Sequence, residues 1–190
     1  MLPRPGGQRL APIPMSHHRG IEYWSEKLAS HPENGRAHRN LAPLMAERAA
    51  RGQKGAKEAV MTHLKHAVHY DPGSDAARND LGVALLNAGN TVLAIAQFEA
   101  GLKSTPSSAM LHKNLAAAYA RTGAFKKALL HAHEASRFAP LDPQAHRNLA
   151  KLYDATGNTR DSLHHNRMAL RLGPGKVTEG RVRDRADAET

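Results

Sequence analysis

The sequence predicts an all-α protein, a right-handed solenoid of about four helical hairpins preceded by a capping helix. The first observation is a constant internal period, since apolar, glycine and proline positions recur at one spacing, as in Leu81, Leu115 and Leu149. The second is that each period holds two helix-spaced apolar stretches, the later one ending near a proline. Only 4% of residues are aromatic, which suits thin helical layers. Such a unit cannot bury its apolar face alone, so stacking should build the core.

Composition excludes several classes of protein. The chain has no cysteine, which rules out disulfides and thiolate chemistry and fits a reducing compartment. It holds no run of about 20 apolar residues, so no membrane span is expected. Residues 35–174 contain 19 basic and 10 acidic residues, so most of the net charge of +10 belongs to the repeat region. We therefore expect an intracellular protein, in the cytoplasm or in an organellar or ciliary compartment, with a basic folded body.

Residues 1–34 should form an arm and a cap. Residues 1–20 hold four prolines, three glycines and no acid, which predicts an extended arm. Their basic residues loosely resemble a targeting peptide, but the prolines spoil the helix that such peptides need. An arm held by another surface is the alternative. Residues 21–34 should form a capping helix ended by His31-Pro32, with Trp24 and Leu28 facing inward.

Four repeats follow, at residues 35–74, 75–108, 109–142 and 143–174. In the third, the pattern predicts helices over 110–121 and 124–138, joined by a turn in which Gly123 is left-handed.

Two repeats depart from the pattern. The first fits only with six extra residues between Met45 and Val60, which lengthen its hairpin tip, and Pro43 should kink its first helix. The fourth has Ser162 and Asn166 at apolar positions, which suits the polar outer face of a terminal repeat or docking on a polar partner. The charged residues 175–190 should form a disordered tail or a fully exposed helix.

The recurring residues resemble the tetratricopeptide repeat family. Its pattern places Leu-Gly, Tyr, Gly, Ala, an aromatic residue, Ala and Pro in order along a 34-residue unit. The second repeat follows it with Leu81-Gly82, Leu85, Gly89, Ala94, Phe98, Gly101 and Pro106. The resemblance extends over residues 35–174 and implies a non-catalytic protein that binds other proteins.

The resemblance also implies a binding surface, because first helices line the concave groove in this family. By position, the groove would present Arg36, Arg39, Asn40, Asn79, Lys113, Asn114, Arg121, Arg147, Asn148 and Lys151. Asn40, Asn114 and Asn148 share one repeat position and offer both donors and acceptors to an extended peptide backbone. This is similar to the asparagine ladder of the enzyme that attaches N-acetylglucosamine to proteins. Flanking cations favour an acidic segment. The alternative is that these asparagines only cap or solvate helices.

A clamp for the C-terminal tail of a chaperone, found in some members of the family, is not expected. It needs an asparagine one turn after the basic residue of the first repeat. The corresponding positions here are Pro43, Val83, Ala117 and Lys151.

Thirteen histidines raise the question of a metal site. Those at 63, 66 and 69 drift around one helix, so no metal site is expected. One of these, His63, shares its repeat position with His131 and His165, and Gln97 occupies that position in the second repeat. This row is either pH-sensitive, a partner contact, or a plain polar row.

No catalytic signature is present, so neither an enzyme nor a cofactor or small-molecule substrate is expected. Nucleic-acid binding is disfavoured, because the groove lacks aromatics for stacking bases. The sequence therefore predicts a scaffold or adaptor that binds an acidic protein segment. The alternative is a constitutive subunit of a large organellar or ciliary complex, with possible contacts to a nucleic-acid backbone.

Overall fold

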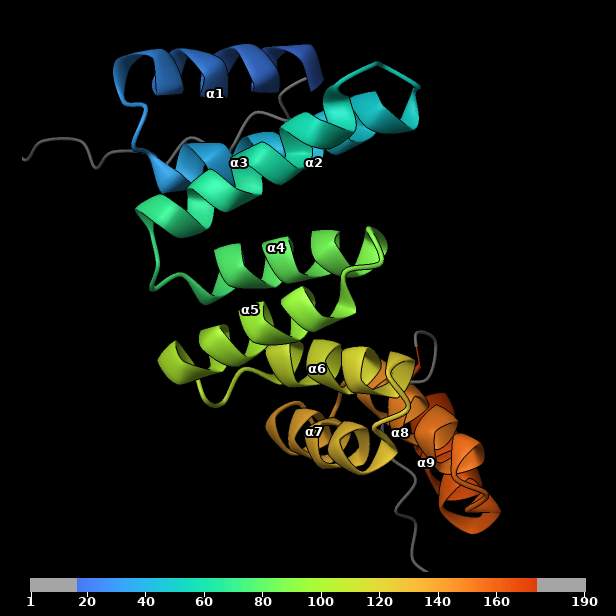
Figure 1. Ribbon diagram of the computed structural model, residues 1–190. Helices are drawn as coiled ribbons and strands as arrows, with labels where there is room; N and C mark the ends of the chain where they lie inside the picture. Colours follow the sequence, from blue (N-terminus) through green and yellow to red (C-terminus); the bar gives the residue numbers. More distant parts are fainter. Residues whose placement is uncertain (1–16, 174–190) are drawn as a thin grey trace, which may run out of the picture. The chain divides into compact units, whose positions relative to one another are not determined.

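The computed structural model describes residues 17–173, which contain nine α-helices and no strand (Figure 1). The helices are α1 (His17–Ser30), α2 (Gly35–Ala50), α3 (Ala56–Tyr70), α4 (Asp75–Asn87), α5 (Thr91–Ser104), α6 (Ala109–Arg121), α7 (Phe125–Phe138), α8 (Pro143–Ala155) and α9 (Thr159–Leu172). The all-α prediction is confirmed for this part of the chain. Most of the expected arm, residues 1–16, and the expected tail, 175–190, lie outside the described residues.

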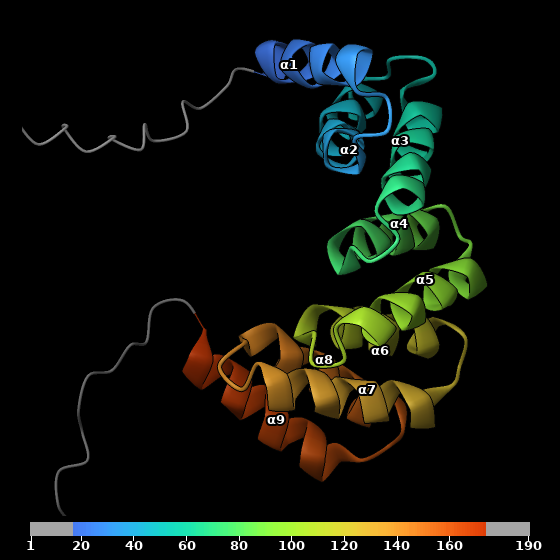
Figure 2. The same ribbon diagram turned by 90° about the vertical axis from the view of Figure 1, so that its left-hand side faces the viewer.

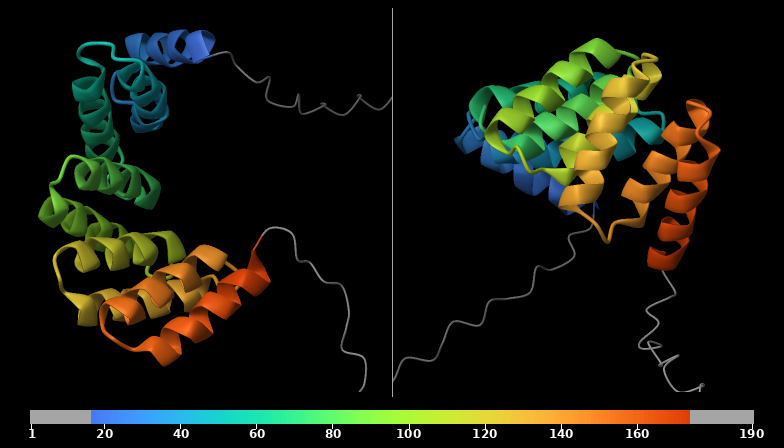
Figure 3. Two further views of the ribbon diagram at one scale, coloured as in Figure 1. Left: turned by 90° about the vertical axis from the view of Figure 1, so that its right-hand side faces the viewer. Right: turned by 90° about the horizontal axis from the view of Figure 1, so that it is seen from below.

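The chain divides into two compact units, residues 1–72 and 73–190. In the first unit, α2 and α3 form a hairpin and α1 packs on α2. In the second unit, the hairpins α4–α5, α6–α7 and α8–α9 follow one another, as the green to red helices of Figure 2 show. There α5 packs on α6 and α7 on α8, while the first helices α4, α6 and α8 contact each other in turn (Figure 3). The first helices thus share one side of the second unit, which we call the first-helix face.

Side-chain caps set where the first helices begin. The carboxylate or hydroxyl oxygens of Ser74, Ser108 and Asp142 accept hydrogen bonds from backbone N–H groups in the first turns of α4, α6 and α8. These bonds satisfy donors that a helix N-terminus leaves without partners. Each first helix ends just before a glycine with positive φ, as at Gly123, where φ is 75°. The predicted left-handed glycine turn is confirmed, and each second helix ends before a proline as expected.

Small residues allow the helices of each hairpin to approach closely. Gly82 of α4 lies against the ring of Phe98 of α5, which is fully buried. The next repeat carries Ala116 and Ala132 at these two positions, both buried. Leu115 and Leu149 fill the core at equivalent points, as the internal period predicts. Equivalent positions therefore form the core of each hairpin, but one repeat pairs a glycine with a large ring where the next pairs two alanines.

The first unit accommodates its six extra residues at the hairpin tip, as predicted. Helix α2 has 16 residues where α4 has 13, and a turn over residues 51–55 leads into α3. Helix α2 continues through the exposed Pro43, and the kink predicted there stays a prediction.

The capping helix differs from its prediction in two ways. Helix α1 begins at His17, so the expected arm is helical over 17–20. Its buried apolar residue is Ile21, while Trp24 and Leu28 are only half-buried. All three residues lie on one face of the helix, but the most buried position is Ile21, one turn before the predicted Trp24.

In the last repeat, the predicted polar outer face is wrong for Ser162. Its side chain is only 1% exposed, while Asn166 is exposed and its Nδ2 donates to the Ser162 Oγ over 3.4 Å. A serine hydroxyl is small enough to occupy the site that alanine fills in the preceding repeat, Ala128. The substitution is therefore accommodated inside the hairpin rather than at its outer surface.

Candidate functional site

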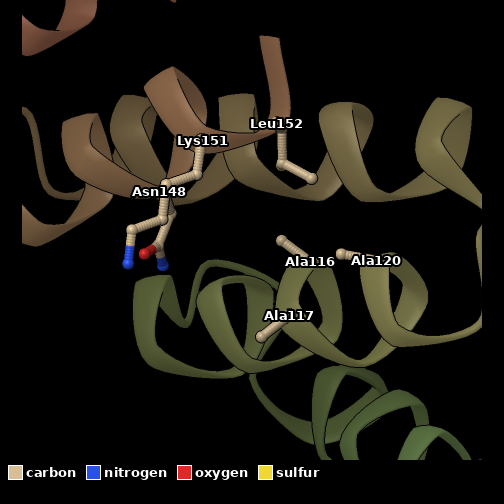
Figure 4. A pocket seen from close by; sticks show the side chains of 6 residues that line it. All are labelled: Ala116, Ala117, Ala120, Asn148, Lys151 and Leu152. Carbon is tan, nitrogen blue, oxygen red and sulfur yellow. The ribbon is translucent and has the colours of Figure 1, made fainter. Parts of the chain in front are cut away.

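A pocket of about 260 Å³ opens between α6 and α8 on the first-helix face (Figure 4). It is lined by Ala116, Ala117, Ala120, Asn148, Lys151 and Leu152. We call this the α6–α8 pocket. The sequence signal for it is a run of alanines on two consecutive turns of α6, which leaves space because none of them extends beyond Cβ.

The α6–α8 pocket has an apolar wall and one polar edge. The alanines of α6 and the buried Leu152 of α8 supply the apolar wall. Asn148 and Lys151, three residues apart on α8, lie together at one end, and Figure 4 shows their nitrogen atoms on the same side. Residues three apart on a helix share a face, so both side chains can reach one ligand.

Lys151 is exposed and has no hydrogen-bond or ion-pair partner among residues 17–173. Asn148 uses its Oδ1 to accept a hydrogen bond from Gln144 Nε2 over 3.0 Å. That bond leaves the Asn148 Nδ2 donors available for another group. The pocket edge therefore presents a cation and an amide donor that the protein itself does not satisfy within its described part.

The other predicted cations of the second unit are already engaged. Lys113 Nζ pairs with the Asp142 carboxylate over 3.1 Å. Burial acts to raise the pKa of Asp142, but the backbone N–H of Gln144 and the Lys113 ammonium outweigh it, so that pKa lies below its usual value. Arg121 donates to the Leu86 carbonyl over 2.9 Å, and Arg147 donates to the Gln144 Oε1 over 3.4 Å. These three side chains contribute positive charge to the first-helix face, but some of their hydrogen-bond donors are already used within the protein.

The predicted asparagine ladder is partly internal. Asn79 is only 6% exposed, so it offers little surface to a partner, and its role in binding stays a prediction. Its Oδ1 accepts a hydrogen bond of 2.6 Å from Asn114 Nδ2, which ties α4 to α6. Sequence reasoning could not separate this from peptide binding, because an amide pairs equally well with a neighbouring amide and with a backbone.

Three predicted residues belong to the first unit. Arg36 is exposed on α2, while Arg39 and Asn40 are half-buried there. Of the ten predicted residues, the structure therefore brings Asn148 and Lys151 together at one pocket. Four more lie on the same two helices, α6 and α8, but do not line the pocket: Lys113, Asn114, Arg121 and Arg147.

Histidine pairs join the two helices of three hairpins. The Nδ1 atoms of each pair are hydrogen-bonded, with separations of 2.9 Å, 3.0 Å and 3.2 Å for His38–His63, His112–His131 and His146–His165. In each pair the first-helix Nε2 is also hydrogen-bonded to a proline carbonyl, as His112 is to Pro106 over 3.0 Å. The second repeat has Arg78 bonded to Gln97 at these positions.

The proline carbonyl fixes the tautomer of each pair. A carbonyl only accepts, so the first-helix Nε2 must carry its proton and donate. The Nδ1 of that neutral ring is then an acceptor, and the second-helix Nδ1–H donates to it. Burial lowers the pKa of His131, and the neighbouring His112 lowers it further. While this hydrogen bond remains, the first-helix ring keeps an unprotonated Nδ1, so the two rings of a pair cannot both be cationic.

The predicted row of His63, His131 and His165 is therefore half-buried, and each of its rings donates a hydrogen bond to a buried histidine of the first helix. The sequence reasoning missed the partners His38, His112 and His146. A signal was available, because His112 and His146 each precede their partner by the same offset, which also separates Arg78 from Gln97. In these three hairpins the two residues at that offset face each other across the pair of helices.

Within residues 17–173 no group of three or more His, Asp or Glu side chains is arranged to hold a metal ion. No helix in that range is both long and apolar enough to cross a membrane.

The comparison with protein families decides the classification. The sequence model described as "Tetratricopeptide repeat" matches residues 22–172. The chain belongs to the tetratricopeptide repeat family. This family's helical hairpins generally serve as non-catalytic scaffolds for protein–protein interaction, so protein partners are implied. None of the curated proteins matches the chain.

Solved tetratricopeptide structures share the fold at low sequence identity. MamA from Desulfovibrio magneticus RS-1 (residues 41 to the end) has a TM-score of 0.70 at 17% identity, covering 83% of this chain and 85% of that one. TTC0263, a protein of Thermus thermophilus, has a TM-score of 0.66 at 20% identity, covering 84% of each chain. YrrB, described as a TPR protein with an unusual peptide-binding site, has a TM-score of 0.66 at 13% identity, covering 84% and 79%.

Proposed function

We propose that this protein is a non-catalytic adaptor that binds an acidic segment of a partner protein on its first-helix face. The observation that carries the proposal is the α6–α8 pocket, where the Lys151 ammonium and the Nδ2 donors of Asn148 have no partner among the described residues. A cation and an amide donor at the edge of an apolar pocket suit a carboxylate next to a peptide backbone.

The charge around the pocket supports an acidic partner. Four cations lie on α6 and α8: Lys113, Arg121, Arg147 and Lys151. The acids on or next to these helices are Asp142, which is already bonded to Lys113, and Asp154. Like-signed fields of this kind speed the association of oppositely charged segments and disfavour basic ones. The peptide-binding site named for YrrB supports the view that a chain of this fold can hold a peptide.

A constitutive subunit of a larger complex is the second candidate. Leu163 and Leu170, seven residues apart on α9, are 53% and 73% exposed, and large apolar side chains on one face of a helix suit contact with another protein. A permanent neighbour covering this helix would explain the exposure. The two candidates use different surfaces, so they can be separated by mutation.

The test is affinity capture from the protein's own cells with tagged full-length chain, comparing wild type, Lys151→Glu, Lys126→Glu and Leu163→Glu. Lys126 is an exposed lysine of α7, so its reversal makes the same change in net charge away from the pocket. The proposal predicts a set of proteins that high salt and Lys151→Glu both remove, while Lys126→Glu retains it. Capture that is insensitive to Lys151→Glu contradicts the adaptor proposal, and a complex lost only in Leu163→Glu would favour the subunit.

A further inference from the structure

The size of the α6–α8 pocket restricts what can enter it. Its volume of about 260 Å³ is below the roughly 300–1,000 Å³ of small-molecule and cofactor sites. The lining is hydrocarbon on three sides, from Ala116, Ala120 and Leu152, of which Ala116 and Leu152 are buried. An apolar group gains by leaving water there, whereas a charged group would lose its hydration without a partner. The space therefore fits one aliphatic side chain.

The same surface one repeat earlier differs at two of the equivalent positions. Between α4 and α6, the positions equivalent to Ala120 and Lys151 carry Leu86 and Ala117. Leu86 is buried and its side chain is larger than that of alanine, so it takes up more volume than Ala120 does in the next step. The asparagine equivalent to Asn148 is Asn114, whose Nδ2 is already donated to Asn79. An open pocket, a free amide donor and a free cation thus coincide only at the α6–α8 step of the second unit's described residues.

The polar edge adds a second requirement on the occupant. Lys113 is held by Asp142, so the cation available to a ligand carboxylate at the pocket is Lys151. The Nδ2 of Asn148 lies beside it and can donate to a backbone carbonyl (Figure 4). Both groups are at one end of the apolar wall, so the carboxylate must lie within a residue or two of the buried side chain along an extended segment.

We infer that the α6–α8 pocket selects a short motif in which one aliphatic residue enters the pocket and an Asp or Glu next to it, or one residue further, pairs with Lys151. Asn148 donates to the carbonyl between them. This inference rests on the proposed function and narrows it from an acidic segment to an aliphatic–acidic one. The occupant is a segment of another protein.

The test is selection of a phage-displayed random heptapeptide library on the full-length chain, with counter-selection on an Ala117→Leu variant. Ala117 is exposed on a helix, so leucine there fills the pocket without entering the core and keeps a good helix former. Circular dichroism of each variant checks folding. The expected result is enrichment of sequences with Leu, Ile, Val or Met within two residues of Asp or Glu.

Fluorescence anisotropy of the enriched peptides then assigns the contacts. Lys151→Glu should weaken binding about tenfold or more, because it replaces attraction by repulsion at the carboxylate. Ala117→Leu should weaken it to a similar extent, and Lys126→Glu should change it less than about twofold. Replacing the aliphatic residue of the peptide by Asn should cost as much as Ala117→Leu does.

The outcomes separate this inference from the proposed function. Acidic peptides that bind in a Lys151-dependent manner without any aliphatic residue would overturn the motif and leave the adaptor proposal standing. No enrichment, or enrichment of basic peptides, would overturn both. Selected sequences that match this chain would make the occupant a segment of the chain itself or of a second copy, and would overturn the inference.

Discussion

Substituting Gly82 by alanine tests how closely the helices of the second repeat approach. A Cβ at this position would lie 2.3 Å from Cε1, 2.7 Å from Cζ and 2.8 Å from Cδ1 of Phe98. The ring is fully buried, so it can relieve the contact only by displacing its neighbours in the core. Such overpacking costs about 1–3 kcal/mol, and the better helix propensity of alanine offsets about 1 kcal/mol of this. We expect Gly82→Ala to destabilise the chain by up to about 2 kcal/mol.

A double-mutant cycle isolates the contact. Phe98→Ala alone should cost about 3–5 kcal/mol, because it empties a buried site. In that background Gly82→Ala should stabilise by about 0.5–1 kcal/mol, since the new methyl meets no ring and favours the helix. The double variant reproduces the pair Ala116 and Ala132 that the next repeat uses. The two effects of Gly82→Ala thus have opposite signs, which corresponds to a coupling of about 2 kcal/mol.

The assay is urea unfolding of the four proteins followed by far-ultraviolet circular dichroism, with the slopes compared to confirm that the same surface is exposed. Equal effects of Gly82→Ala in both backgrounds would refute the reasoning. So would a wild-type background in which alanine stabilises, because the ring would then have room to move.

Three further predictions concern His131, Asp142 and Tyr119 of the second unit. The lowered pKa of His131 means that the unfolded chain binds more protons below about pH 6.5, so stability is complete above that pH and falls as pH drops through it. The double substitution His112→Arg with His131→Gln, which copies the second repeat, should reduce the slope of Tm against pH between 7.5 and 5. Asp142→Ala removes a helix cap and the partner of a lysine, and should cost about 1–2 kcal/mol in urea unfolding, whereas Asp154→Ala on the exposed end of α8 should cost less than about 0.5 kcal/mol. Burial and a hydrogen bond to Glu99 raise the pKa of Tyr119 to about 12, so a spectrophotometric titration should show one tyrosine ionising near there, and Tyr119→Phe should remove it.

The fold was predictable because its determinants are local and repeated. Gly123, the closing prolines and the recurring leucines each act within one hairpin, so a constant internal period carries them directly. The extra residues of the first repeat could be placed for the same reason. Helix boundaries in the third repeat agree with the pattern within one residue.

The site was less predictable because its character depends on which side chains pair with each other. A period places Asn79, Asn114 and Asn148 at or near the same surface, but it does not say that the first two bond to one another. The period likewise predicts the same binding role for Lys113 and Lys151, although Asp142, the N-cap residue of α8, forms an ion pair with Lys113 and not with Lys151. The pocket follows from alanines whose importance lies in the volume that they leave empty, which residue chemistry alone does not show.

Placement of the partner can be measured directly by photo-crosslinking in the protein's own cells. The crosslinking amino acid benzoylphenylalanine is introduced in place of Asp154, an exposed residue three positions after Lys151 on α8, or in place of Lys126 on α7 as the matched control. Our account predicts crosslinked partner bands from position 154 that Lys151→Glu abolishes, with none from position 126. Bands from position 126, or bands from 154 that persist in Lys151→Glu, would contradict binding at this pocket.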